Sequence, residues 1–533
     1  MSSLGRTQLL CCFVIGATSG VLWCPSPLAA AQQPLSSAQS HAEHGLVFAQ
    51  AGELEMAESE FRRAVDQAPS NVQYIDTLAT ILAREQKFQD AVAWLEKAVK
   101  LAPTELKLRR DLGTAQWQAG KLEAARDNLE RVLKATPKDQ QVTLLLGMVY
   151  ESLKDYARAA KLFSSVEPLV RQHPESIAAM AASCYRIGMK DKARELLTTL
   201  KSNPADPQGV FLGGQVATDA ADYEMAEELF TSIKSTFPDR ATVGYKLASV
   251  QFRANRVEAS QRTLLDLISA GDQKSEVYEL LGWCYHKQGQ IEEAVRAFEK
   301  AIDLEPAQEG NYLGLGTIFL EQRQFRPARS VAEDLLARHP DSCNGYLLKG
   351  MAQLQLGEFT DAVESYGRAL QLDPTAPEAH VGLASAQWSA GMTAAATNTF
   401  EENLKLFPRD ANNCQEYGRF LLKQAETGDR TAEARAIAQL DKAIDLNEAL
   451  PESHFLLGNL LLTKEEIPQA LPHLERAVQL DPQASRYRLA LARAYRRAHR
   501  NDDAARELQA FQSLRAAEEK LAAATNLPQS GRN

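Results

Sequence analysis

Apolar residues recur along most of the chain with the three- and four-residue spacing of amphipathic helices. Within residues 275–308, Tyr278, Leu281 and Tyr285 mark the apolar side of one helix, and a second run of the same kind is centred on Phe298. A glycine separates the two runs, as expected where one helix ends and the next begins. No run of alternating Val, Ile and Thr residues predicts a strand. The pattern therefore predicts an all-α chain built from pairs of helices.

The helix pair repeats every 34 residues. Gly45 and Phe61, for example, correspond to Ala79 and Leu95 one period later. About fourteen copies fill residues 38–518, and they begin near residues 38, 72, 106, 140, 174, 207, 241, 275, 309, 343, 377, 411, 451 and 485. A repeat array of this kind explains how 533 residues fold without one large core, because single cores stop growing at roughly 250–300 residues.

Certain places within the copy keep their residue type. The eighth residue is Gly or Ala in every copy, and the twentieth is Ala in every copy except 241–274, which has Ser260. Small residues at both places are expected to let two helix backbones come close. Proline stops the second helix in nine copies, as Pro69, Pro103, Pro137, Pro238, Pro306, Pro340, Pro374, Pro408 and Pro482.

At these places the chain resembles the tetratricopeptide repeat family, whose 34-residue unit is a helix–turn–helix. The resemblance implies a right-handed superhelical solenoid that binds other proteins on its concave face. In such an array each copy is stabilised by its neighbours, because no copy can bury its apolar face alone.

Three segments depart from the regular pattern. The copies at 174–206 and 241–274 lack the terminal proline, which predicts a weaker middle stretch. The copy at 411 is six residues longer, and we expect a longer loop at Gln424–Thr431. At the C-terminus, Phe511, Leu514 and Leu521 continue an apolar stripe, and residues 519–533 are expected to hold the end of a capping helix and a disordered tail.

The first 31 residues have the features of a signal peptide. Arg6 precedes an uncharged apolar stretch, Leu9–Leu22, which is followed by the cleavage-site pattern Ala29-Ala30-Ala31. A retained membrane anchor is the alternative, although this stretch is shorter than the roughly 20 residues that cross a bilayer. We therefore expect a signal at 1–31, a linker at 32–37, export to the periplasm or the extracellular space, and no membrane span afterwards.

The charge balance argues against nucleic acid as a partner. The formal net charge of the chain is −10, and it becomes −11 without the signal, with 58 basic residues against 69 acidic ones. A basic surface supplies most of the affinity of proteins for nucleic acids and for anionic lipids.

No pattern in the sequence predicts catalytic chemistry. The nine histidines form no HExxH pattern, and no G-x-S-x-G occurs. His41 and His44 lie three residues apart and could in principle bind a metal, but packing within the first helix explains them better. The glycines of 310–316 follow no strand, so a phosphate loop is not expected. We predict no catalytic residue, no cofactor and no metal, and a protein that is not an enzyme.

Four cysteines follow the signal, and they are Cys184, Cys284, Cys343 and Cys414. They lie two or more copies apart, which places stacked helices beyond the reach of a disulfide. We therefore expect four free thiols.

Partner binding is predicted from a second stripe on the first helix of each copy. The second, fifth, ninth and twelfth places should be polar if this face were merely solvated. Instead they hold large apolar residues, which are Phe211, Tyr245, Phe252, Trp283, Leu313, Leu320, Leu347, Met351, Leu354, Val381, Trp388 and Phe455. In this family such a stripe resembles the lining of the binding groove. The alternative is that superhelical winding buries these side chains against adjacent helices.

Two further features bear on the partner. Arginines crowd the last copy, and Arg486, Arg493, Arg496 and Arg497 either solvate its surface or form a basic docking patch for an acidic partner. The Lys, Asn and Arg pattern with which some family members grip a C-terminal carboxylate is missing. Two roles are therefore open: an exported scaffold that binds other polypeptides, or a non-catalytic subunit of a cell-envelope enzyme or polysaccharide-export complex.

Overall fold

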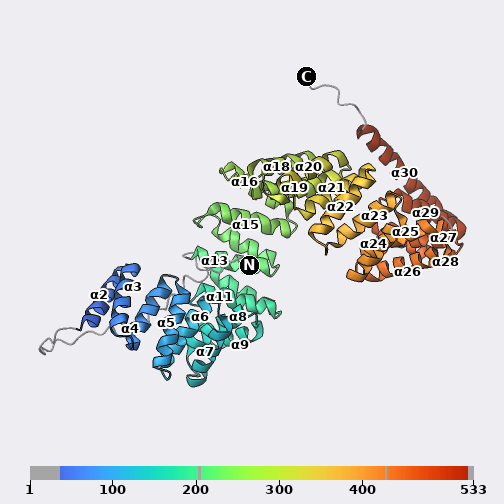
Figure 1. The fold of residues 1–533 in the computed structure, drawn as a ribbon. Coiled ribbons are helices and arrows are strands. Elements are labelled where there is room, and N and C mark those ends of the chain that lie inside the picture. The colour runs from blue at the N-terminus through green and yellow to red at the C-terminus, as the bar shows by residue number, and fades with distance from the viewer. Residues whose placement is uncertain (1–35, 202–205, 427–428, 526–533) are drawn as a thin grey trace. The chain divides into compact units, whose positions relative to one another are not determined.

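The computed structural model describes residues 36–201, 206–426 and 429–525. Within these residues the chain forms 29 helices and no strand, which confirms the all-α class (Figure 1). The helices are α2 (Ser37–Ala51), α3 (Leu54–Gln67), α4 (Val72–Arg84), α5 (Phe88–Leu101), α6 (Leu106–Gln118), α7 (Leu122–Ala135), α8 (Gln140–Ser152), α9 (Tyr156–Ser165), α10 (Glu167–Val170), α11 (Pro174–Arg186), α12 (Lys190–Lys201), α13 (Pro207–Asp219), α14 (Tyr223–Ile233), α15 (Arg240–Arg253), α16 (Val257–Ser269), α17 (Ser275–Lys287), α18 (Ile291–Leu304), α19 (Glu309–Glu321), α20 (Phe325–Arg338), α21 (Cys343–Leu356), α22 (Phe359–Leu372), α23 (Pro377–Ser389), α24 (Thr393–Leu406), α25 (Ala411–Glu426), α26 (Arg430–Leu446), α27 (Pro451–Thr463), α28 (Ile467–Leu480), α29 (Ser485–Arg497) and α30 (Asn501–Thr525).

The chain divides into two compact units, one up to Asp272 and one from Gln273 onward. In the first unit the first helices of the copies are α2, α4, α6, α8, α11, α13 and α15. In the second unit they are α17, α19, α21, α23, α25, α27 and α29. Each first helix packs against the second helix of its own copy, and each second helix inside a unit packs against the next first helix. The boundary between the units follows α16, the second helix of a copy that lacks the terminal proline.

The turn inside the copy has the same backbone conformation almost throughout. Its residue at the fifteenth place has a positive φ, for example 73° at Gly289 and 60° at Asn255. Glycine adopts this left-handed conformation at no steric cost, whereas a side chain disfavours it. The turn therefore explains why glycine recurs at this place.

In most copies with glycine at the eighth place, this residue makes room for one bulky side chain of the second helix. At Gly316 the nearest side chain is instead Leu348 of α21. A Cβ atom added to Gly282 of α17 would lie 2.7 Å from two ring atoms of Phe298 of α18, and Phe298 is fully buried. Gly45 and Phe61 form the same contact, and a Cβ atom added to Gly45 would lie 2.6 Å from a ring atom of Phe61. At Gly45 the nearest backbone atom, the carbonyl oxygen of Ala57, is farther away at 3.4 Å. The closest approach is thus between the first helix and a side chain of the second, and the two backbones come near as a consequence.

A buried hydrogen bond also joins the two helices in several copies. A glutamine at the eleventh place accepts through its side-chain oxygen from a residue twelve positions later. These pairs are Asn128 to Gln116 at 2.8 Å, Thr263 to Gln251 at 2.9 Å, Ser365 to Gln353 at 2.7 Å and Thr399 to Gln387 at 2.8 Å. Because burying an unpaired amide is costly, this bond fixes the register of the two helices.

The expectation of a longer loop in the copy at 411 is wrong. Gln424 lies inside α25, which continues to Glu426, and Thr431 lies inside α26. Asp429 caps α26 by accepting hydrogen bonds from the backbone N–H groups of Thr431 and Ala432. The extra residues therefore lengthen both helices, because Ala, Glu and Arg favour helix and Asp429 supplies a good start.

The second helix of the last copy continues past the repeat as α30 without a break. The apolar stripe of Phe511 and Leu514 lies on this continuous helix, and both side chains are partly buried. The expected signal at 1–31, most of the linker at 32–37 and the expected tail from Asn526 onward lie outside the described residues.

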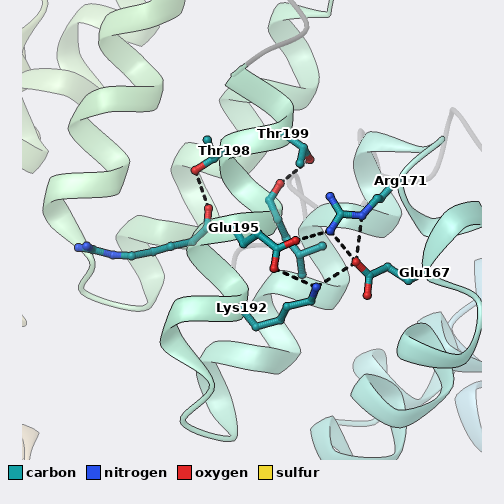
Figure 2. Close-up of polar contacts among 8 residues, drawn as sticks. Glu167, Arg171, Lys192, Glu195, Thr198 and Thr199 are labelled. Atoms are coloured by element: carbon teal, nitrogen blue, oxygen red, sulfur yellow. Dashed lines mark hydrogen bonds and ion pairs between the residues drawn. The ribbon is translucent and has the colours of Figure 1, made fainter.

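The copy at 140–173 has a broken second helix. The chain leaves α9 at Ser165 and forms the short helix α10, which begins beside Pro168. Two cations and two anions hold α10 against α12, as Figure 2 shows. Arg171 contacts Glu167 and Glu195 at 2.5 Å each, and Lys192 contacts the same carboxylates at 2.9 and 3.0 Å. The charges alternate and satisfy one another, so this network stabilises the interrupted copy.

The four cysteines are free thiols, and all except the partly exposed Cys343 are buried. Burial raises the pKa of Cys184, Cys343 and Cys414, which lowers the thiolate fraction and hence their reactivity. None of the helices in residues 36–201, 206–426 and 429–525 has the length and hydropathy that a bilayer crossing requires.

The contact at the eighth place predicts opposite effects of one substitution at two helical glycines. Gly282→Ala should destabilise α17 and α18 by about 1–3 kcal/mol, because the new methyl group overlaps the buried ring of Phe298. Gly367→Ala in α22 should stabilise its helix by about 0.5–1 kcal/mol, because a Cβ there meets no atom within 4 Å. Native-state hydrogen exchange of α17–α18 and of α21–α22 measures both effects. Equal changes at the two sites would contradict the packing role of the eighth place.

Candidate functional site

The candidate binding surface in the second unit is the stripe on its first helices. It consists of Trp283 on α17, Leu313 and Leu320 on α19, Leu347, Met351 and Leu354 on α21, Val381 and Trp388 on α23, and Phe455 on α27. None of these nine side chains belongs to the buried core. Eight are partly exposed, and Met351 is 48% exposed. The stripe therefore differs both from a solvated polar face and from a packed interior.

The two tryptophans of the stripe each rest on a core ring. Trp283 meets Phe298 edge to face with 5.2 Å between ring centroids, and Trp388 meets Phe420 in the same way at 5.4 Å. Each indole therefore has one side fixed by packing, while part of its surface remains accessible. Rigid aromatic anchors of this kind lose little conformational entropy on binding.

Neighbouring first helices bring their stripe places side by side. Arg419 of α25 lies over the ring of Trp388 of α23, with its guanidinium 5.9 Å from the ring centroid. His286 of α17 forms an ion pair or hydrogen bond of 2.6 Å with Glu321 of α19. These contacts connect α23 with α25 and α17 with α19, so they join successive copies within the unit.

In the first unit the stripe is short. Phe211 on α13 stacks on Phe237 at 4.9 Å, and Tyr245 and Phe252 on α15 are partly exposed. Earlier copies differ: Leu144 and Met148 occupy the same places on α8 but are 0% and 6% exposed. On α8 these two places are therefore part of the buried core.

Most other stripe places of the first unit are polar, although Leu46 at the ninth place of α2 is 47% exposed. Lys107 on α6 forms an ion pair with Asp76 on α4, which joins two stripe places of neighbouring copies. The run of partly exposed apolar stripe places on the successive first helices α17, α19, α21 and α23 belongs to the second unit.

The structure divides the four arginines of the predicted basic patch into two pairs. Arg486 is bound by Glu452 at 2.6 Å and lies over the ring of Tyr487, and Arg497 donates to the backbone oxygen of Leu462. Arg493 and Arg496 are exposed and form no hydrogen bond or ion pair with any residue that the structure describes. Only the second pair is available to a partner.

A polar cleft that the sequence did not predict lies between α20, α21 and α22. Its volume is about 670 Å³. The lining carries charges of both signs, including Arg329, Lys349, Glu333 and Asp361, and Gly367 leaves one wall without a side chain. The position of this glycine in the middle of a helix is the only sign of the cleft in the sequence. Arg329 and Glu358 pair with each other at 2.5 Å, while Nε of Arg329 and Oε2 of Glu358 have no hydrogen-bond partner among the described residues.

The two histidines considered as metal ligands both face one carboxylate. His41 lies 2.6 Å from Glu60 of α3, and His44 lies 4.0 Å from it. Within the part of the chain that the structure describes, no group of three or more His, Cys, Asp or Glu side chains is arranged to hold a metal ion.

A pair of histidines is partly buried between α27 and α28. The Nδ1 atoms of His454 and His473 are 3.2 Å apart, and Nε2 of His454 lies 3.2 Å from the backbone oxygen of Glu448. A carbonyl oxygen can only accept, so Nε2 of His454 carries a proton and its Nδ1 accepts from His473. Burial lowers the pKa of both histidines, and in His454 the neighbouring His473 lowers it further.

Known protein families account for this architecture. Profiles described as tetratricopeptide repeat match residues 42–105, 110–176, 275–308, 311–342, 434–485 and 455–519, and a TPR repeat profile matches 350–391. The chain belongs to the tetratricopeptide repeat (TPR) family. Its helix pairs are TPR units, and its stripe lies on the first helices of these units.

Individual relatives are similar over only part of their length. Protein CTR9 homolog of Arabidopsis thaliana is 27% identical over 48% of this chain, which spans 24% of that protein. Cellulose synthase operon protein C of Pseudomonas fluorescens is 23% identical over 62% of this chain and 27% of that protein. Among solved structures, yeast Tom70 is 17% identical over 86% of this chain and 97% of that chain, with a TM-score of 0.41.

The histidine pair predicts a loss of stability in acid. Because the folded-state pKa of both rings lies below the ordinary value of about 6.5, the unfolded state binds more protons below that pH. Stability should therefore fall as pH decreases from about 6.5, by up to about 1.4 kcal/mol per pH unit for each ring.

Hydrogen exchange of α27 and α28, corrected for intrinsic rates, measures this dependence between pH 7.5 and 5.5. His473→Gln should reduce the pH dependence of stability. His499→Gln, at an exposed turn, should leave that dependence unchanged. Equal pH dependence in both variants would refute the assignment.

Proposed function

We propose that this TPR protein is an interaction scaffold that binds a segment of another polypeptide on the stripe of its second unit. The observation that carries the proposal is the partial exposure of apolar side chains on successive first helices, with Met351 at 48%. A soluble surface normally avoids a continuous apolar stripe unless a partner covers it. Membership of the TPR family supports the same role.

The composition of the stripe suits a polypeptide ligand. Tryptophan, leucine and methionine offer large contact areas, and the flexible thioether of Met351 can adapt to different side chains. The first helices also carry polar residues beside the apolar places, and these polar residues can form hydrogen bonds with the backbone of a partner. An extended or helical segment would place successive apolar side chains against successive copies.

We propose that the chain itself performs no catalysis. The described residues are almost entirely helices of TPR units, and the sequence holds no HExxH or G-x-S-x-G pattern. Any chemistry in a complex would then belong to the partner.

We further propose that the protein is exported, because Arg6, the apolar stretch Leu9–Leu22 and Ala29-Ala30-Ala31 form a signal-peptide pattern. Mass spectrometry of the protein recovered from the periplasm or medium of its source should show a chain that begins near Gln32. An intact chain that starts at Met1 would contradict cleavage, and recovery from the cytoplasm alone would contradict export.

A second candidate function is a non-catalytic subunit of a cell-envelope enzyme or polysaccharide-export complex. It is favoured by the similarity to a cellulose synthase operon protein over 62% of this chain. Purification from the native compartment separates the two roles. A single enzyme recovered in constant ratio supports the subunit, whereas several unrelated polypeptides that compete for the stripe support the scaffold.

The stripe can be tested with side chains that contribute least to folding. In the variant Leu320→Gln/Met351→Gln/Val381→Thr, partner recovery should fall at least about tenfold, because each lost anchor costs roughly 1 kcal/mol of binding. The melting temperature should remain nearly constant, since none of the three side chains is in the buried core.

Met392→Gln/Leu406→Gln is a matched control, because these residues are 43% and 52% exposed but lie outside the stripe. Loss of recovery in the stripe variant alone supports the proposal. A lower melting temperature of the stripe variant would show that the stripe belongs to the packed core. Normal partner recovery by this variant would show that the binding site lies elsewhere.

A further inference from the structure

Charge changes sign along the stripe of the second unit. The first helix at one end, α17, presents Glu276 and Glu279, and neither has an ion-pair partner among the residues that the structure describes. Burial raises the pKa of Glu279, and the nearby charge of Glu276 raises it further, so no cation compensates this pair. The opposite end, α29, presents Arg493 and Arg496, which are also unpaired within the described residues.

The middle of the stripe carries no charge. On α19, α21 and α23 the fifth, ninth and twelfth places hold Leu313, Thr317 and Leu320, then Leu347, Met351 and Leu354, then Val381, Ser385 and Trp388. A ligand that covers these helices therefore makes mainly apolar contacts with them. Its charged groups would meet the protein only beyond them.

Basic character begins at α25. Arg419 lies over Trp388, and its ion pair with Glu416 leaves its Nε atom without a hydrogen-bond partner within the described residues. Two first helices later, Arg493 and Arg496 occupy the ninth and twelfth places of α29. The positive end is thus in line with the apolar stripe and occupies the same places of the TPR unit.

We propose that the partner segment carries apolar side chains over α19–α23 and carboxylates at the end that reaches α29. Arg493 and Arg496 attract those carboxylates, while Glu276 and Glu279 repel them at the other end and so fix the direction of the segment. The inference rests on the proposed function, since it assumes that the stripe is the binding surface.

Helix spacing sets the length of such a segment. Five steps separate α19 from α29, and first helices at spacings of about 8–10 Å give roughly 40–50 Å. An extended chain covers that distance with about 12–15 residues at ~3.3 Å each. The occupant is therefore a peptide segment and not a single acidic side chain.

Selection from a library of 15-residue peptides tests the proposal on the full chain. Peptides retained by the unaltered protein should combine apolar residues with Asp or Glu gathered at one end. The variant Arg493→Gln/Arg496→Gln should retain peptides without this acidic end. The control Lys300→Gln/Lys405→Gln removes the same charge from exposed places on the second helices α18 and α24, and it should keep the preference.

Fluorescence anisotropy with one selected peptide then measures how much the acidic end contributes to the binding affinity. Replacing its acidic residues by Gln or Asn should weaken binding to the unaltered protein by about five- to tenfold at low salt, as expected for two exposed ion pairs. The same replacement should change little in Arg493→Gln/Arg496→Gln, and circular dichroism checks that this variant remains folded.

Each contrary result has a distinct meaning. Selected peptides without an acidic end, or an acidic end that survives in the arginine variant, would overturn the charge inference and leave the stripe as a binding site. If the variant Leu320→Gln/Met351→Gln/Val381→Thr retains the peptides as well as the unaltered protein does, the proposed function itself is overturned. Binding of an acidic polysaccharide that needs both arginines but not the stripe would show that the ligand is not a polypeptide.

Discussion

The contact between a glycine at the eighth place of the first helix and a bulky side chain of the second helix is the constraint that sets the packing of most copies with this glycine. Phe298 fills the space that Gly282 leaves open, and Phe61 does the same opposite Gly45. In the copies with glycine, an added Cβ atom would overlap the inserted side chain, which restricts the rotation of the two helices relative to each other. The buried glutamine bonds, such as that between Gln353 and Ser365, then fix their register.

The rotation set by this contact decides which side of the first helix remains outside the pair. The eighth place points into its own copy, so the fifth, ninth and twelfth places point away from the second helix. In the second unit most of those places keep part of their surface accessible, although Leu462 of α27 is buried, and the core rings beneath Trp283 and Trp388 hold the indoles in place. The surface that we propose for binding is thus a consequence of the same packing that stabilises the fold.

Local changes in sequence alter individual copies without disturbing their neighbours. The broken second helix at α9 and α10 is held by the alternating charges of Glu167, Arg171, Lys192 and Glu195. The longer copy absorbs its extra residues by extending α25 and α26. Because each copy contacts only those beside it, such variations need compensation only locally.

The sequence by itself determined the helix pairs, the 34-residue period and the family, because helical periodicity and small residues at fixed places are local properties of the chain. It also placed the apolar stripe on the first helices. Exposure was decided only by tertiary packing, since Met148 and Met351 occupy the same place of their copies but are 6% and 48% exposed. Tertiary structure likewise divided the arginines of the last copy, because pairing depends on neighbours such as Glu452 that are distant in sequence. The expected loop at Gln424–Thr431 is a further case, since Gln424 belongs to α25 and Thr431 to α26.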